Sequence, residues 1–426
     1  MTGPLSRTDR PARGLPAGVE DDRTARMAWS RLCEPADLAA AALVETWGAL
    51  GALGWVVEHT SPGRGDVGAG AAAADGRSTG STDDPQVAQG VPARLRRPLQ
   101  RWAHRLGALD LGADVAALEA VRGRVVVPGD DGWPGALDDL GPAAPMCLWV
   151  RGEPDVGALL HGSVALVGAR ACTEYGSWVA GGIAAEVAEH GRTVVSGGAY
   201  GIDAAAHRGA LAVRRPTVAF LAGGVDRLYP AGNTRLLESI IASGGAVISE
   251  VPPAAVPSKH RFLLRNRLIA AASAATVVVE AARRSGALAT AHRASDLLRP
   301  LGAVPGPVTS AVSAGCHELI RDGEATCVTG ADEVLELVGP LGTGEGRARE
   351  AWRDPGLDER RDVSGGPGGL DARVCDALPV RVAADVGSVA RAAGLTVLET
   401  TAALGRLELL GLAHRADGRW RLAERS

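Results

Sequence analysis

Short apolar runs alternate with longer helical stretches from residue 163 onward, and this alternation limits the possible folds more than any other feature of the chain. The runs are SVALVG (163–168), TVVSGG (193–198), TVAFLAGG (217–224), GAVISE (245–250), ATVVVE (275–280) and GAVPG (302–306). The stretches between them are rich in Ala, Leu, Arg and Glu. Strands that alternate with helices form a mostly parallel sheet with helices on both faces. The sequence therefore predicts an α/β fold with a doubly wound, mostly parallel sheet.

Segments of other composition flank this core, and the chain is long enough for roughly two to four domains. Residues 123–150 add two short strand-like runs around turns. From the amino to the carboxyl end we expect a disordered tail (1–26), a small helical domain (27–121) with a low-complexity insertion (60–93), the α/β core (122–338), a linker (339–369) and a C-terminal module (370–426).

Composition excludes several classes of protein. The formal net charge is −4, which rules out a globally basic nucleic-acid coat but leaves room for a local basic groove. The six cysteines form no CxxC pair, so a zinc ribbon is not expected, and scattered thiols suit a reducing, cytoplasmic compartment. The first 30 residues hold no apolar leader. Glu45, Gly51 and Gly54 interrupt the apolar stretch 38–57, so we expect a buried helix pair there and not a membrane span.

The turns after the strands are the places where a parallel sheet binds ligands. Gly168-Ala169-Arg170 follows the first strand, and Tyr175 comes soon after. The dinucleotide fingerprint GxGxxG is absent. An arginine at a helix entry suits a phosphodiester oxygen, because its planar fork adds to the backbone N–H donors. The alternative is that Arg170 pairs with a surface carboxylate.

Two further turns are rich in glycine. Ser196-Gly197-Gly198 opens the second, where glycines let the backbone pass close to a ligand and expose N–H groups. Asp203 is expected to cap the next helix. The alternative is a tight turn followed by a helix N-cap. Gly223-Gly224 opens the third, which also carries Tyr229. All three tyrosines of this aromatic-poor chain fall in the turns, which favours ligand contact or loop anchoring over core filling.

The fourth turn, which we expect to be a loop, is cationic. No acidic residue lies between Glu250 and Glu280. The segment contains Lys259, His260, Arg261, Phe262, Arg265, Asn266 and Arg267. Cations beside an aromatic ring suit single-stranded nucleic acid, because charges meet phosphates and a ring stacks on a base. A solvated helix face is the alternative.

A final turn contains one more expected anion-binding position and one carboxylate. Ser285-Gly286 stands at an expected helix start, and Glu280 ends a strand, where it is either a catalytic acid or structural. His207 and His292 are lone histidines in expected helices, and no Ser-His-Asp set, HExxH, EF-hand or Walker lysine occurs. Binding is therefore better supported than catalysis.

Seven blocks in one order give the chain a family resemblance. They are GAR-x4-YG (168–176), SGGAYGIDAAAHRGAL (196–211), GGVDRLYPAGN (223–233), SEVPP (249–253), FLLRNRLIA (262–270), VVVEAARRSGALATA (277–291) and VPG with GCHELIRDGE (304–324). Over about residues 123–338 the chain resembles the DNA-processing protein A (DprA/Smf) family. The resemblance implies an extended Rossmann-like core that binds single-stranded DNA in a positively charged pocket. It also implies a homodimer formed through that core, loading of the RecA recombinase, no cofactor and no established catalytic activity.

The resemblance assigns roles residue by residue. Arg170 corresponds to the family's pocket arginine, Arg265–Arg267 to its RNR segment, and Phe262 to its aromatic residue. Departures occur at Ala169, where the family usually has Ser, and at Arg261 and Leu263, where it usually has Asn and Pro. The expected DNA-binding residues are Gly168, Arg170, Tyr175, Ser196, Gly197, Gly198, Lys259, Arg261, Phe262, Arg265, Asn266, Arg267, Ser285 and Gly286.

The C-terminal module reads as three helices and a hairpin, which is a winged helix. Thr396 and Glu399 form a capping box, and a DG pair at 417–418 predicts the hairpin turn. The third helix has Glu399 and Glu408 against Arg406 alone, so duplex binding, protein contact and a structural role remain open.

Three functions follow as hypotheses. The first is a non-enzymatic single-stranded DNA binder and recombination mediator, without a membrane role. The second is a nucleotide-acting enzyme of the phosphoribohydrolase type with Glu280 as its acid, although that family's glycine-threonine loop is missing. The third is a nucleotide-sensing regulator that uses the winged helix.

Overall fold

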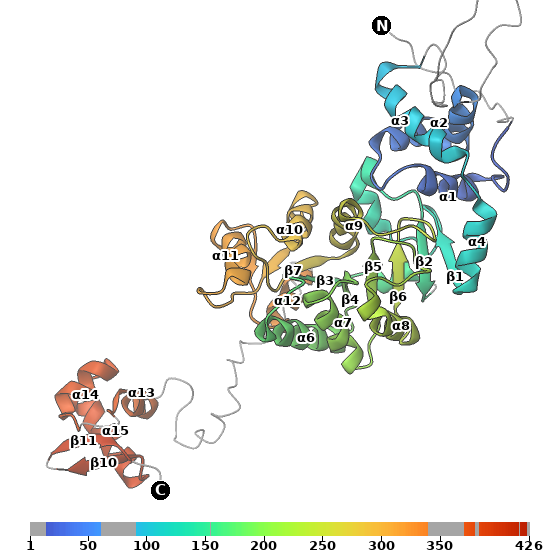
Figure 1. Cartoon of the computed structure of the whole chain (residues 1–426). Coiled ribbons are helices and arrows are strands. Elements are labelled where there is room, and N and C mark those ends of the chain that lie inside the picture. Colours follow the sequence, from blue (N-terminus) through green and yellow to red (C-terminus); the bar gives the residue numbers. More distant parts are fainter. Residues whose placement is uncertain are drawn as a thin grey trace, which may run out of the picture. The chain divides into compact units, whose positions relative to one another are not determined.

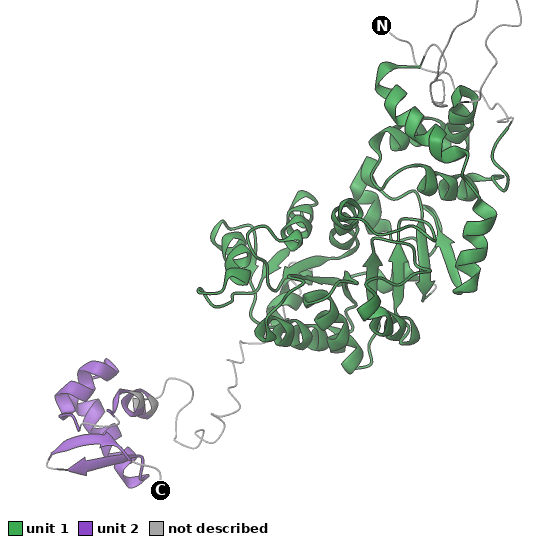
Figure 2. Cartoon of the chain, in the orientation of Figure 1, with its two compact units in different colours: residues 1–343 green, residues 344–426 purple. Residues whose placement is uncertain are grey.

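The computed structural model describes residues 14–60, 91–153, 155–339, 370–379, 383–416 and 418–423. The chain divides into two compact units, residues 1–343 and 344–426 (Figure 2). Most of the expected tail, insertion and linker, and Asp417 of the DG turn, lie outside the described residues.

A nine-stranded sheet forms the centre of the first unit (Figure 1). Its strands are β1 (Gly123–Val126), β2 (Leu148–Gly152), β3 (Val164–Val167), β4 (Val194–Gly197), β5 (Thr217–Leu221), β6 (Ala246–Ser249), β7 (Ala275–Val278), β8 (Leu301–Ala303) and β9 (Thr326–Cys327). The order is β1-β2-β6-β5-β4-β3-β7-β8-β9; the β1–β2 and β2–β6 pairs are antiparallel, and the other pairs are parallel. The predicted mostly parallel sheet is confirmed. The chain reverses its direction of progress between β3 and β7, which is where such sheets bind ligands.

Helices cover both faces of the sheet, as Figure 1 shows. They are α5 (Val156–Leu160), α6 (Glu174–Glu189), α7 (Ile202–Ala212), α8 (Thr234–Ala242), α9 (Lys259–Ala272), α10 (Gly286–Asp296), α11 (Ala314–Arg321) and α12 (Ala331–Val338). Val164 and Leu166 of β3 pack against α6 and α7, whereas Ala165 and Val167 pack on the side of α9 and α10. This alternation follows from the two-residue period of a strand, and it buries the sheet on both sides.

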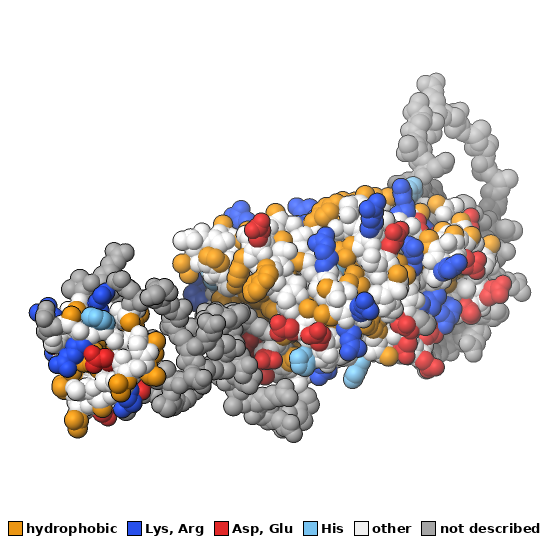
Figure 3. Space-filling view, turned by 90° about the horizontal axis from the view of Figure 1, so that it is seen from below, with side chains coloured by type: hydrophobic (Ala, Val, Ile, Leu, Met, Phe, Trp, Pro, Cys, Tyr) orange, Lys and Arg blue, Asp and Glu red, His pale blue; other side chains and the backbone are white. Residues whose placement is uncertain are grey.

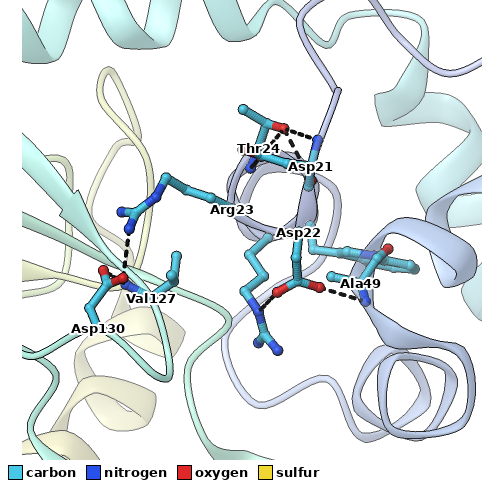
Figure 4. A network of polar contacts seen from close by, with 9 residues as sticks. Asp21, Asp22, Arg23, Thr24, Ala49, Val127 and Asp130 are labelled. Atoms are coloured by element: carbon cyan, nitrogen blue, oxygen red, sulfur yellow. Dashed lines mark hydrogen bonds and ion pairs between the residues drawn. The ribbon is translucent and has the colours of Figure 1, made fainter.

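Four helices precede the sheet: α1 (Asp22–Leu32), α2 (Leu38–Thr60), α3 (Ala93–Leu106) and α4 (Leu111–Ala120). The expected tail extended to residue 26, but α1 begins at Asp22 because Asp21 and Thr24 form a capping box. Figure 4 shows how α1 is fixed: Asp22 accepts a hydrogen bond from the Ala49 amide, and Arg23 forms a 2.6 Å ion pair with Asp130.

Helix α2 carries the apolar stretch noted in the sequence. It is long and apolar enough to span a membrane by composition, and it is the single such helix among the described residues. Its backbone leaves the helical region at Gly48 (φ 71°), so two helical pieces meet there, as the expected helix pair requires. Leu43 and Leu53 are buried in one apolar cluster with Trp29 and Trp102, whose rings meet edge to face at 5.2 Å.

The second unit contains α13 (Leu370–Ala377), α14 (Val386–Ala393), α15 (Val397–Leu409), β10 (Ala413–Ala416) and β11 (Arg419–Leu422). The three helices and the hairpin appear in the predicted order, and the capping box of Thr396 and Glu399 is confirmed. The winged-helix assignment stays a prediction.

Candidate nucleic-acid interface

Four side chains gather at the carboxyl ends of the central strands. Arg170, in the loop after β3, places its guanidinium carbon 4.5 Å from the centroid of the Phe262 ring. Arg265 approaches the same ring to 5.9 Å, and the Tyr229 ring lies 6.1 Å away. We call these four residues the Phe262 cluster. Arg170 is exposed and Tyr229 is 48% exposed, so the cluster presents a cation and aromatic surface to solvent.

The cationic segment expected as a loop is instead the helix α9. Ser258 caps it by accepting a hydrogen bond from the Arg261 amide at 3.2 Å. A helix turns successive side chains to different sides. Lys259 at the start is exposed and Phe262 is half-buried, whereas Arg265, Asn266 and Arg267 are buried.

Two of the expected DNA-binding cations are already paired. Arg267 is 4% exposed and forms hydrogen bonds of 2.6 and 2.7 Å with both carboxylate oxygens of Glu250. Arg261 binds both carboxylate oxygens of Glu34, at 2.9 and 3.0 Å. The sequence did not indicate these ion pairs, because residues 251–279 contain no acidic residue and both glutamates lie outside that segment. Neither arginine offers a free charge to phosphate.

Arg265 lies below the surface of the cluster. Its guanidinium donates to the Phe220 carbonyl, and burial lowers the pKa of Arg265 to about 10, so the side chain stays charged at neutral pH. A Cβ at residue 197 would overlap this guanidinium, which explains the glycine there. Arg265 thus supplies a fixed positive charge beneath the glycine-rich turn.

Asp203 does not cap α7 as expected, because Gly201 occupies the N-cap position. The buried Asp203 carboxylate turns back into the loop and accepts from the Ala199 amide at 3.4 Å. Burial raises the pKa of Asp203, and the charge of Arg265 offsets part of that shift.

The glycine-rich turn is held by residues whose roles the sequence did not reveal. The Asn233 amide donates to the carbonyls of Gly198 and Ala199, at 2.9 and 3.0 Å. The His207 ring lies 2.9 Å from the Gly197 carbonyl. Ser196 is buried and donates to the Leu166 carbonyl, so its hydroxyl is turned inward. These contacts fix the shape of the turn.

Glu280 fixes the loop that carries Arg170. Its carboxylate accepts from the Thr173 amide at 2.9 Å and from the Thr173 hydroxyl at 2.6 Å. Its carbonyl accepts from the Ala169 amide at 2.7 Å. Glu280 is 1% exposed, and both carboxylate oxygens have donors. These contacts favour the structural reading of Glu280 over the catalytic one.

The remaining expected residues border the cluster. Gly168 is packed against Ile202. The Tyr175 hydroxyl donates to the Pro305 carbonyl at 2.8 Å. Ser285 caps α10, and Asn266 donates to the Gly286 carbonyl at 3.1 Å, which links α9 to the start of α10. Across the described ranges, no group of three or more potential metal ligands occurs.

The wider surface is mixed in charge. Figure 3 shows Lys and Arg side chains among Asp and Glu side chains on the face that it presents, and hydrophobic side chains lie between them. This agrees with the net charge of −4 and with a local, not global, basic site.

A Rossmann-like sheet with cationic and aromatic side chains beyond the carboxyl ends of its strands defines a class of ligand-binding α/β proteins. Residues 124–339 match the model of the family described as DNA recombination-mediator protein A. The DNA processing protein DprA of Mycobacterium tuberculosis is 43% identical over 325 residues, covering 74% of this chain and 81% of that protein. The chain belongs to the DNA recombination-mediator protein A family, and it is a protein of DNA processing in recombination.

A further relative agrees in both sequence and structure. The DNA processing protein DprA of Streptococcus pneumoniae is 37% identical over 208 residues, which are 49% of this chain and 72% of that protein. The X-ray structure of DprA from the same organism matches with a TM-score of 0.50 at 35% identity, covering 57% of this chain and 82% of that chain.

Proposed function

We propose that the chain binds single-stranded DNA at the Phe262 cluster. The observation that carries this proposal is the exposed guanidinium of Arg170, 4.5 Å from the ring of Phe262, beyond the carboxyl ends of the central strands. A base that stacks on a ring and a phosphate that meets a cation are the two contacts that single strands require.

Each residue of the site has a distinct role in this proposal. Arg170 and the exposed Lys259 neutralise phosphates, and Phe262 or Tyr229 stacks against a base. The buried Arg265 adds a positive charge that the neighbouring Asp203 carboxylate partly offsets. Arg261 and Arg267 have structural roles, because Glu34 and Glu250 already neutralise them.

We further propose that the protein acts in the cytoplasm without catalysis, as a homodimer formed through its α/β core, and delivers the bound strand to the RecA recombinase. The family resemblance supports this part of the proposal. Retention of RecA by the immobilised chain, and a dimer mass in solution, are the measurements that test it.

The binding test compares oligo-dT with a matched duplex across a salt series, for the wild type and for Arg170→Ala. We expect the strand to bind more tightly than the duplex. In the variant the slope of log K against log salt should fall by about 0.7, which corresponds to one lost phosphate contact. The control is Arg215→Ala, because Arg215 is exposed and precedes β5, at the amino end of that strand.

Two results would refute the proposal: equal affinity for strand and duplex, or unchanged binding by Arg170→Ala. Release of free base from a nucleoside monophosphate would instead support the phosphoribohydrolase alternative with Glu280.

A further inference from the structure

Helix α3 carries a stripe of cations that the Phe262 cluster does not include. Its 14 residues, ARLRRPLQRWAHRL, contain five arginines and a histidine and no acidic residue. Arg94, Arg97 and Arg101 follow one another at spacings of three and four, so they lie along one side of the helix. All three are exposed. We call them the α3 stripe.

The other side of α3 is firmly packed. Pro98, Leu99 and Trp102 are buried, and Leu99 and Trp102 join the apolar cluster formed with α1 and α2. The stripe is therefore fixed in place by the core of the helical domain. At 1.5 Å per residue the stripe runs about 10 Å along the helix, from Arg94 to Arg101.

Most of the positive charge of the stripe is uncompensated. Arg101 approaches Asp37 only to 3.6 Å and keeps 61% of its side chain exposed. Among the residues that the structure describes, Arg94 and Arg97 have no ion-pair partner. Exposed cations on a packed helix without carboxylates form a ready surface for phosphates.

One carboxylate joins this helix to the site on the sheet. Glu34 forms an ion pair with Arg105, near the end of α3, at 2.7 Å. It also pairs with Arg261, in the first turn of α9, at 2.9 Å. Two cations share this one carboxylate, and Arg261 directly precedes Phe262 in the chain. The α3 stripe and Phe262 of the cluster therefore lie on two helices that Glu34 joins.

We propose that a single DNA strand held at the Phe262 cluster continues across this junction and follows the α3 stripe. This inference rests on the proposed function and adds a second, sequence-independent section to the site. The small helical domain would then extend the length of strand that the protein holds, and the first residues to touch the strand would remain those of the cluster.

The experiment separates the two sections by strand length. Oligo-dT of about 6 nucleotides, near the lower end of known single-strand site sizes, can occupy the cluster alone, whereas about 30 nucleotides reach both sections. The variant is Arg94→Gln/Arg97→Gln, since glutamine keeps a good helix propensity. The matched control is Arg214→Gln/Arg215→Gln, two exposed arginines before β5. All are measured as full-length chains across a salt series.

We expect the α3 variant to bind the long strand more weakly, with a salt slope lower by about 1.4, which corresponds to two phosphate contacts of about 0.7 each. Its binding of the short strand should equal that of the wild type, and the control should match the wild type with both strands. Arg170→Ala should weaken both.

The outcomes distinguish the inference from the proposed function. If Arg170→Ala weakens binding but the α3 variant keeps the wild-type slope with the long strand, the α3 section does not exist and the cluster remains. Equal loss on both lengths would also overturn the inference, since α3 would then be the primary contact. If Arg170→Ala does not change oligo-dT binding, the proposed function is refuted, and the inference that rests on it is refuted as well.

Discussion

Single residues of the site combine charge with burial in different ways. Arg170 is exposed, so its guanidinium can contact a phosphate. Arg265 is buried and can act on a phosphate only through the electric field of its charge. Phe262 lies near both guanidiniums, at 4.5 and 5.9 Å. Its ring therefore positions Arg170 as well as offering a face to a base.

Replacing Phe262 separates these roles. Phe262→Leu keeps an apolar side chain but removes the ring, and stacking contributes about 1–3 kcal/mol per base, so oligo-dT affinity should fall by roughly tenfold or more. Phe262→Tyr should restore most of it. Fluorescence anisotropy with labelled oligo-dT measures both variants. Equal affinities for the leucine and tyrosine variants would show that no base stacks there.

His207 predicts a pH dependence of stability. Burial lowers the pKa of His207 to about 4, and the ring lies between the Gly197 carbonyl and the Thr217 hydroxyl. A carbonyl can only accept, so Nε2 carries the proton of the neutral ring and donates it to Gly197. The unfolded state takes up a proton near pH 6.5 and the folded state does not. Stability should therefore fall as the pH drops from about 6.5 to about 4, by up to about 3 kcal/mol.

Urea unfolding at pH 7.5 and pH 5 checks this expectation. His207→Gln, which cannot titrate, should be less stable at pH 7.5 but should lose less on acidification than the wild type does. An identical loss in both proteins would assign the pH dependence to other groups.

At the scale of elements, the sequence predicted the sheet well and α9 poorly. The strand runs were readable because each is apolar, short and followed by glycine or a polar turn. The cationic segment lacked a clear apolar stripe, since Arg265, Asn266 and Arg267 are among its buried residues. Burial of Arg267 depends on Glu250, 17 positions away. Such pairing is a tertiary contact that no local pattern displays.

The turn between β4 and α7 gives an element-scale prediction. Gly201 has φ +78°, and a Cβ there would overlap the Ala169 carbonyl oxygen. Gly201→Ala should cost about 1–3 kcal/mol of stability and displace the loop that carries Arg170, which should weaken strand binding. Gly182→Ala, on an exposed and open part of α6, should leave binding unchanged. Thermal unfolding and anisotropy test both variants.

At the scale of the whole first unit, polar contacts far apart in sequence hold the helical domain to the sheet. Arg23 pairs with Asp130, Arg31 donates to the Pro253 carbonyl, and Arg261 pairs with Glu34. Within the helical domain, Asp114 holds Arg31 in place. The Arg261 contact spans 227 positions. The sequence could indicate a helical domain and a core, but it could not indicate these contacts, because each depends on the final arrangement of both.

Replacing Arg31 should show how much this attachment contributes to the free energy of unfolding. Asp114 is 4% exposed, and burial raises its pKa although Arg31 opposes the shift. Arg31→Met leaves a buried carboxylate without its partner, so stability should fall by about 2–4 kcal/mol at neutral pH. The loss should shrink in acid, where protonation removes the uncompensated charge. Melting curves at pH 5 and pH 8 measure it.

A second substitution tests the cause. Adding Asp114→Leu to Arg31→Met should recover much of the stability, because no buried charge then remains. Failure to recover would mean that the bond from Arg31 to the Pro253 carbonyl supplies most of the attachment.

The amides of Ala169 and Thr173 donate hydrogen bonds to Glu280 in the free protein. This implies that the loop carrying Arg170 is already ordered before DNA binds. Little conformational entropy would be lost on association, so released counterions would account for most of the driving force. Deuterium uptake at these two amides should then be slow in the free protein, and adding oligo-dT should slow it little further.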